Sequence, residues 1–359
     1  MSKTDSSTQS NPAISEPSLT SLAHGGGCGC KIAPGILEDI LRGSQPLPVP
    51  EALLVGIETS DDAAVYKLNE HQAIVATTDF FMPVVDDPHD FGQIAATNAL
   101  SDVYAMGGTP IFALALVGMP INTISTKTIG RILDGGATAC RKAAIPIAGG
   151  HTIDSVEPIY GLVAMGLVDP AHIKRNADAR PGDVLILGKP LGVGIFSAAL
   201  KKKALANDAY ARMIENTTRL NTPGPELARL AGVHAMTDVT GFGLAGHAWE
   251  MARGSGHSIR INWSDVPLLK GARELAEDGF ITGASGRNWA SYGDHVHYER
   301  TMDNVDQALL SDPQTSGGLL VACAREAVAE VLNIFHTQGF SDATIIGMVE
   351  EGEAGLVIS

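Results

Sequence analysis

The sequence predicts a protein of mixed α and β class with two domains of similar size. The chain has 359 residues, enough for two domains that each bury a core. From about Ala52 onward, short apolar runs alternate with longer amphipathic runs, as strands and helices do. The polar, proline-containing stretch at 169–183 separates two such series, and we therefore expect the domain boundary there.

The first series predicts five strands and two helices. The strands are expected at 52–57, 63–68, 73–78, 111–117 and 159–168. One helix is expected over 90–106, because Asp90 can cap its start and Gly107 can end it. The second helix is expected over 126–143.

The second series begins with a strand over 184–188, and several helical runs are expected between about 190 and 254. Further strands are expected near 259–263, 319–323 and 345–349, with a helix around 324–338.

The residues before Ala52 carry weaker signals. The first twenty are rich in Ser, Thr, Pro and Asn and lack the basic start and apolar middle of a signal peptide, so we expect a disordered tail. Residues 34–43 are typical of a short helix, and residues 45–52, with three prolines, are typical of a linker.

Composition narrows the function class. The net charge of −15 argues against general binding to nucleic acid or a membrane surface, but it allows a phosphate ligand held through metal ions. No apolar run reaches the roughly 18 residues that a membrane span needs. The four cysteines are too few for a disulfide scaffold, so we expect reduced thiols and a cytoplasmic location.

Aspartates recur just beyond apolar runs, among small polar residues. They are Asp61, Asp62, Asp79, Asp102 and Asp238. Carboxylates at the ends of strands and helices can converge in a cleft, where they suit Mg²⁺ and a phosphate ligand. Asn98 and Asp102 lie four apart and so share one face of the predicted helix. The alternative is that each aspartate only caps a turn.

The stretch HGGGCGCK, residues 24–31, admits several interpretations. It does not fit a Walker-type phosphate loop, because no Gly directly precedes Lys31 and no Ser or Thr follows it. Cys28 and Cys30 could be half of a zinc or redox pair, although no matching pair occurs elsewhere. Alternatively, Lys31 lowers the pKa of a reactive thiol on a glycine-rich lid. A flexible arm with incidental cysteines is the remaining possibility.

Seven motifs occur together in an order that resembles the selenophosphate synthetase family, also called selenide, water dikinases. The motifs are HGGGCGCK, GIETSDDAAVY, TTDFFMP, DFGQIAATNALSDVYAMGG, AGGHTID, AMTDVTGFG and DPQTSGGLL. The resemblance covers nearly the whole chain after about Leu19.

The resemblance implies a fold of α/β and α+β domains, shared with aminoimidazole ribonucleotide synthetase. It implies a flexible segment at 1–50 that carries the Cys and Lys motif, and an ATP- and Mg²⁺-binding dimerisation domain at 51–170. In this fold the first domain forms a β-barrel across a dimer, and an α+β domain follows at 180–359.

The activity that the resemblance implies is ATP-dependent synthesis of selenophosphate from selenide and water, with release of AMP and orthophosphate. The product would donate selenium for selenocysteine and selenouridine synthesis. The implied partners are ATP, selenide or a selenium-delivery protein, and a second copy of the chain.

The resemblance also assigns residues. Cys28 matches the active cysteine or selenocysteine, and Lys31 matches the catalytic lysine that contacts phosphate. The positions that match magnesium ligands are Asp62, Asp102 and Asp238. The positions that match nucleotide contacts are Thr59, Ser60, Asp61, Asp79 and, near the phosphates, Asn98. Gly150, His151 and Thr152 match a loop that reaches the nucleotide of the partner subunit.

Several points stay open at this stage: the role of Cys30, the number of metal ions, the need for K⁺, and a covalent selenium intermediate on Cys28. Two rival readings remain. One is a related ATP-using enzyme, such as a thiamine monophosphate kinase or a hydrogenase-maturation protein. The other is a non-catalytic carrier of metal or selenium.

Overall fold

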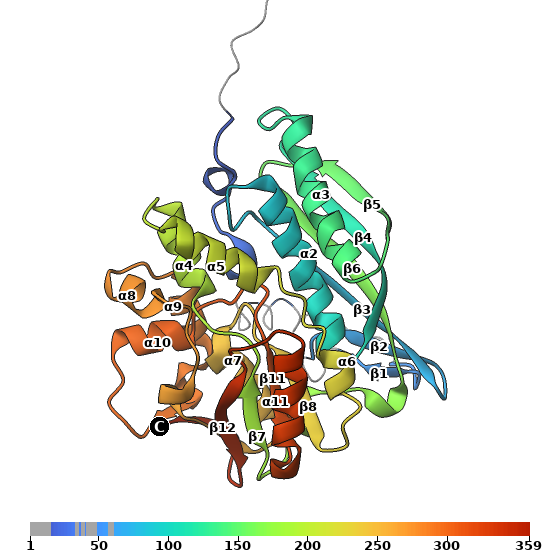
Figure 1. The fold of residues 1–359 in the computed structure, drawn as a ribbon, viewed down its shortest axis with the longest axis vertical. Coiled ribbons are helices and arrows are strands. Elements are labelled where there is room, and N and C mark those ends of the chain that lie inside the picture. The colour runs from blue at the N-terminus through green and yellow to red at the C-terminus, as the bar shows by residue number, and fades with distance from the viewer. Residues whose placement is uncertain (1–15, 33–35, 37–39, 41–48, 57–60) are drawn as a thin grey trace, which may run out of the picture.

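The computed structural model describes residues 16–32, 36, 40, 49–56 and 61–359. Within these residues the chain builds two β-sheets, each covered by helices (Figure 1). The predicted helix over 34–43, apart from Ile36 and Ile40, and residues 45–48 of the linker lie outside the described residues.

The first sheet has six strands in the order β1-β2-β3-β6-β4-β5. Neighbours are antiparallel except β4 and β5, which are parallel. The strand bounds are β1 Leu53–Val55, β2 Ala64–Asn69, β3 Gln72–Phe81, β4 Thr109–Met119, β5 Ile147–Asp154 and β6 Ile159–Val168.

Two helices, α2 (Pro88–Ala105) and α3 (Thr126–Lys142), cover one face of this sheet. Every residue of α2 from Phe91 to Ala105 is buried, because α2 packs against both the sheet and the second domain. The prediction that Asp90 caps this helix is wrong. The cap is Asp87, whose carboxylate accepts from the backbone N–H groups of His89 and Asp90, with Pro88 in the first turn.

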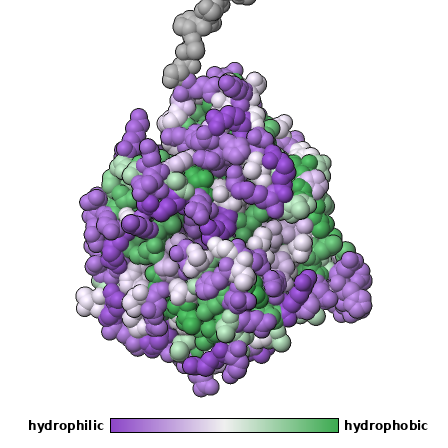
Figure 2. All heavy atoms as spheres, viewed as in Figure 1, coloured by the Kyte–Doolittle hydropathy of each residue, from purple (hydrophilic) through white to green (hydrophobic). Residues whose placement is uncertain are grey.

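The opposite face of the first sheet carries exposed apolar side chains. Phe80 of β3 is 47 % exposed, and Ile153 of β5 is 56 % exposed. Figure 2 shows apolar surface along the side of the molecule where β4 and β5 run in Figure 1. This face is open to a further layer of structure.

The second sheet has seven strands in the order β10-β13-β9-β12-β7-β11-β8. Their bounds are β7 Val184–Leu187, β8 Val233–Asp238, β9 Ser258–Ile261, β10 Val296–Tyr298, β11 Leu319–Cys323, β12 Thr344–Glu350 and β13 Gly355–Ile358. The helices are α4 Val193–Lys201, α5 Asn207–Thr217, α6 Gly224–Leu227, α7 Gly243–Ser255, α8 Ala272–Glu277, α9 Gly283–Tyr292, α10 Asn304–Leu310 and α11 Val328–Thr337.

The described part of the N-terminal segment is packed against the body, so the prediction of a disordered first twenty residues is wrong from Glu16 onward. A 3₁₀ turn, η1, spans Leu19–Leu22, and a second, η2, spans Gly27–Cys30. Leu19 is 2 % exposed, and Thr20 donates from its backbone and hydroxyl to Asp86 at 2.9 and 2.6 Å. An isolated Leu in a polar run gives no periodic signal, which explains the error.

None of the helices in the described part of the chain combines the length and apolar character that a membrane crossing needs.

Candidate active site

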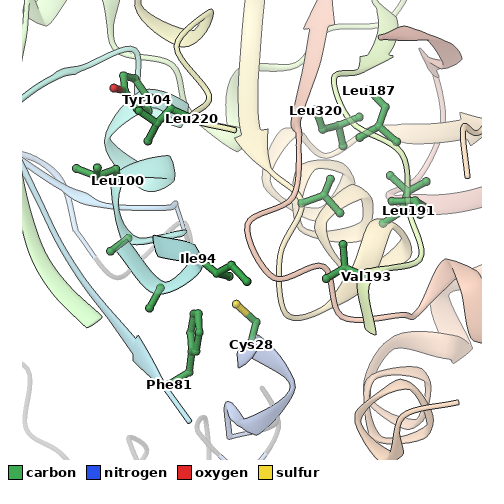
Figure 3. Packing of buried hydrophobic residues seen from close by; sticks show 14 of the residues in the cluster. Cys28, Phe81, Ile94, Leu100, Tyr104, Leu187, Leu191, Val193, Leu220 and Leu320 are labelled. Atoms are coloured by element: carbon green, nitrogen blue, oxygen red, sulfur yellow. The ribbon is translucent and has the colours of Figure 1, made fainter. Parts of the chain in front are cut away.

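Polar side chains from both domains meet where α2 faces the second sheet. They come from η2, from β3, from α2, from the end of β8, and from the turn at 312–318 that leads into β11. Figure 3 shows Cys28 of η2 beside Phe81 of β3 and Ile94 of α2. The first-domain and second-domain motifs of the sequence therefore share one location.

Asn98 is the centre of this arrangement, and its side chain is fully buried. Its amide nitrogen donates to Asp79 Oδ2 at 2.7 Å. Its amide oxygen accepts from the Cys28 thiol at 3.2 Å and from the Ser316 backbone N–H at 2.7 Å. One side chain on α2 thus joins the thiol segment, β3 and the second domain.

Asp79 also binds Lys31, whose Nζ lies 2.8 Å from Asp79 Oδ2. Desolvation acts against the ammonium charge, but the charge of Asp79, followed by Cys28 and Asp102, outweighs it and raises the pKa of Lys31 well above its usual range. The Lys31 side chain as a whole is 37 % exposed.

The sequence pattern predicted that Asp79 follows the end of a strand. In the structure it lies within β3. The strand continues to Phe81, and Asp79 shares its inward face with Val75 and Phe81. Alternation along the strand therefore turns this carboxylate toward α2.

The Cys28 thiol is only 1 % exposed, and burial raises its pKa above the ordinary range for cysteine. The interpretation of Cys28 as a thiol with a lowered pKa is therefore wrong for this conformation. Lys31 does lower the pKa of Cys28, but desolvation of the thiol is the larger effect. Cys30 sits nearby and donates its S–H to the Gly27 carbonyl at 3.0 Å.

The glycines before Cys28 are required for close packing. Gly27 has a φ of +54°, and a Cβ there would lie 2.2 Å from Thr315 Oγ1. That hydroxyl accepts from the Cys28 backbone N–H at 3.1 Å. The tight fit explains how a glycine-rich stretch holds the thiol firmly against the second domain.

Three buried or partly buried carboxylates lie beside this network: Asp62 before β2, Asp102 on α2 and Asp238 at the end of β8. Asp62 accepts from Thr237 Oγ1 at 2.9 Å, and Asp102 accepts from Thr77 Oγ1 at 2.5 Å. The second carboxylate oxygens of Asp62 and Asp238 are buried with no hydrogen-bond partner.

The three carboxylates oppose one another's ionisation. Burial, then the charges of Asp238 and Asp102, raise the pKa of Asp62 well above its usual range. Burial, then Asp238 and Asp79, do the same for Asp102, and burial raises the pKa of Asp238. Buried oxygens without donors and mutually repelling charges fit a hard divalent cation. Among the described residues, however, no three His, Cys, Asp or Glu side chains are grouped closely enough to hold a metal ion in this conformation.

The remaining predicted positions lie outside the described residues or make other contacts. Thr59 and Ser60 are outside the described residues, and Asp61 accepts from the Asn176 backbone N–H at 2.8 Å. The segment with Gly150, His151 and Thr152 was expected to be a loop, but it belongs to β5, an exposed edge strand. Within one chain, β6 and β4 separate β5 from β3, so this segment is not brought together with Cys28.

The motif DPQTSGGLL contributes residues to this site whose roles were not predicted from the sequence. Thr315 holds the Cys28 backbone, and Ser316 donates to Asn98 from a backbone with a φ of +55°. The fully buried Lys189 donates to the Ser316 and Arg219 carbonyls at 2.9 and 2.7 Å, and burial lowers its pKa to about 7. The Thr-Ser-Gly-Gly run was the signal for a strained turn.

The chain matches two family descriptions along most of its length. Residues 60–168 match the AIR synthase related protein, N-terminal domain, and residues 180–358 match the AIR synthase related protein, C-terminal domain. The match confirms the predicted fold class.

Solved structures show the same fold at low sequence identity. A thiamine-monophosphate kinase from Stenotrophomonas maltophilia has a TM-score of 0.63 at 20 % identity, over 86 % of this chain and 92 % of that one. A chain in a HypE–HypF complex has a TM-score of 0.65 at 18 % identity, over 90 % and 95 % of the two chains. These similarities establish the fold alone.

Curated relatives are much more similar in sequence. A selenide, water dikinase from Dechloromonas aromatica is 64 % identical over 338 residues, which cover 94 % of this chain and 97 % of that protein. The selenide, water dikinase from Rhizobium meliloti is 55 % identical, over 95 % of this chain and 98 % of that protein. Identity at this level over nearly full length shows that the chain belongs to the selenide, water dikinase family.

Proposed function

We propose that this chain makes selenophosphate from ATP, selenide and water, and that it releases AMP and orthophosphate. The observation that carries this proposal is the chain of contacts from Cys28 through Asn98 to Asp79 and Lys31. It places a thiol and a lysine beside buried carboxylates, which are the groups needed to guide a selenium nucleophile toward a metal-bound phosphate. The product would supply selenium for selenocysteine and selenouridine synthesis.

Asp62, Asp102 and Asp238 are the residues that would hold Mg²⁺. When bound, Mg²⁺ neutralises the triphosphate and polarises the transferred phosphoryl group. Support comes from the unpartnered oxygens of Asp62 and Asp238 and from the raised pKa values of all three groups. The carboxylates must approach one another to share a cation, so we propose that they do so when nucleotide binds.

Lys31 would offset the charge that develops on the transferred oxygens. Its raised pKa keeps it protonated, and its side chain is partly exposed. Asp79 and Asn98 would orient this lysine and the Cys28 thiol. Thr59, Ser60 and Asp61 complete the proposed nucleotide site.

Burial of Cys28 would also exclude water during the first phosphoryl transfer. Water must enter afterwards to hydrolyse bound ADP to AMP and orthophosphate. The close fit of Gly27 against Thr315 holds the closed arrangement until then. Opening of η2 would have to break the Cys28 contacts with Thr315 and Asn98.

We also propose that the protein is a homodimer in which the open face of the first sheet pairs with the same face of a second copy. The exposed Phe80 and Ile153 support this pairing, because apolar side chains on an open sheet face favour burial. A second copy could bring Gly150, His151 and Thr152 of β5 to the nucleotide of the first. The domain ranges 51–170 and 180–359 and the cytoplasmic location remain proposals, the latter consistent with four free cysteines.

The decisive experiment is phosphorus NMR of the products formed from ATP, Mg²⁺ and selenide without oxygen. We expect selenophosphate, AMP and orthophosphate in equal amounts. Accumulation of ADP would indicate an ordinary kinase. Absence of selenide-dependent AMP would indicate a carrier, and either result would contradict the proposal.

A further inference from the structure

A small cavity adjoins the Cys28 thiol segment on the side of the second domain. Its volume is about 10 Å³, close to the minimum for one water-sized occupant. One wall is formed by Cys28, Gly29 and Lys31. The remaining lining residues come from the turn after β8 and from α9, and they are Gly241, Phe242, Ala284, Arg287 and Asn288.

The charged groups in this lining are both cationic. They belong to Lys31, whose ammonium is paired with Asp79, and to Arg287, and no carboxylate residue lines the cavity. Arg287 donates to the Gly29 carbonyl at 3.1 Å and forms no ion pair within the described part of the chain. The exposed guanidinium is therefore held beside the thiol segment without a carboxylate partner among the described residues, which favours an anion.

The polar groups of Asn288 hold the cavity open. Asn288 is 5 % exposed, and its amide nitrogen donates to the Gly241 and Ser311 carbonyls at 2.8 and 3.1 Å. These bonds fix the turn at Gly241 against α9. A Cβ at Gly241 would lie 3.1 Å from the Cys28 carbonyl and 3.4 Å from Lys31 Cδ, so the absence of a side chain there preserves the space.

We propose that this cavity binds the hydroselenide anion before transfer, with Arg287 as its recognition residue. This inference rests on the proposed function and names the binding place of its second substrate. The volume excludes a phosphate or a nucleotide but suits an anion with a single heavy atom. The apolar walls at Phe242 and Ala284 suit a large, weakly hydrated chalcogen.

The place of the cavity gives a reason for the buried thiol of Cys28. Cys28 lines the cavity and also contacts Asn98, which is bonded to Asp79 in the proposed phosphate site. Hydroselenide in the cavity is therefore separated from the phosphate site by Cys28, and it must pass this residue to reach the γ-phosphate. Arg287 and Cys28 thus act in sequence along one path.

Steady-state kinetics of selenide-dependent AMP formation provide the first test. Arg287→Gln removes the charge, and Ala284→Val fills the cavity. We expect each variant to raise the KM for selenide about tenfold while the KM for ATP stays within twofold, because one charge-assisted contact or the occupied volume is lost. Arg287→Lys should recover part of the affinity. Arg325→Gln, at an exposed arginine of η7, is the matched control and should change neither constant.

Crystals of the Cys28→Ser variant soaked in sodium hydroselenide without oxygen provide a test independent of turnover. Selenium anomalous density beside Arg287 is expected, and it should disappear when Arg287→Gln is added. The inference is overturned if selenium binds elsewhere, or if Arg287→Gln and Ala284→Val leave the KM for selenide unchanged. Failure of the wild-type protein to form AMP would overturn the proposed function instead, whereas the anomalous signal would still report on the cavity.

Discussion

Replacing Asp238 with asparagine should make the metal-free protein more stable while removing its response to Mg²⁺. Asp238 is 1 % exposed, its Oδ2 has no hydrogen-bond partner, and it lies among the charges of Asp62 and Asp102. The amide has nearly the same shape, carries no charge, and can donate to the neighbouring carboxylates.

The size of the effect follows from the cost of one buried carboxylate oxygen without a partner, about 2 kcal/mol, since Ser101 forms a hydrogen bond with this carboxylate. With an unfolding entropy of about 2.1 cal/mol/K per residue, the 359-residue chain has about 0.75 kcal/mol/K in total. The free energy gained then corresponds to a rise in Tm of about 3 °C at pH 8.

The gain depends on pH in a definite direction. The folded-state pKa of Asp238 is raised above its unfolded value, so the wild-type protein retains this group's stabilising contribution only at acid pH. It loses that contribution as the pH rises from about 4 through the raised pKa. The difference between variant and wild type should therefore be large at pH 8 and should shrink as the pH falls.

Thermal unfolding of chelator-treated protein, with and without Mg²⁺ and a non-hydrolysable ATP analogue, measures both effects. Mg²⁺ with the analogue should raise the Tm of the wild type more than that of the variant. Asp342→Asn, at an exposed position between α11 and β12, is the control and should change neither value. A lower Tm of the metal-free Asp238→Asn protein at pH 8, or an undiminished response to Mg²⁺, would refute the reasoning.

Three further outcomes are expected. Cys28→Ser should abolish selenophosphate formation while the Kd for an ATP analogue, measured by calorimetry, changes less than twofold; a variant that binds no nucleotide would show that Cys28 is structural. Asn98→Ala should lower the free energy of unfolding by about 2–5 kcal/mol, because it leaves the Ser316 N–H and the Cys28 thiol without their acceptor; urea denaturation should show this loss and almost none for Asn122→Ala at an exposed position. Phe80→Asp should convert the protein to monomers in sedimentation velocity, whereas Ile345→Asp on the second sheet should not, and an unchanged dimer in both would exclude the proposed face.

Strands with strong apolar runs could be predicted from the sequence, since 159–168 and 319–323 coincide with β6 and β11. Strand β5 was missed because its residues are mostly exposed and two of them are glycines, so neither an apolar run nor a helical period is present. Strand β8 was missed because VHAMTD is short and lies among helical runs. β10 and β13 are likewise short, with three and four residues.

The site was predictable as a set of motifs, but its electrostatic state was not. Nothing in GCGCK reveals that Thr315, nearly three hundred residues away, holds the Cys28 backbone. A neighbouring lysine suggests a low thiol pKa, yet the balance is decided by burial, which depends on tertiary packing. The contacts of Asn98 with three segments likewise depend on how the two domains meet.

The burial of Cys28 has a consequence for the lifetime of the protein under oxidative stress. Peroxide attacks accessible thiolates, and Cys28 at rest offers neither accessibility nor negative charge. The more exposed Cys30 would meet an oxidant first. Under the proposed mechanism, damage to this sulfur would be confined to the brief intervals in which the segment opens during turnover, and an idle pool of the protein would keep its catalytic capacity in reserve.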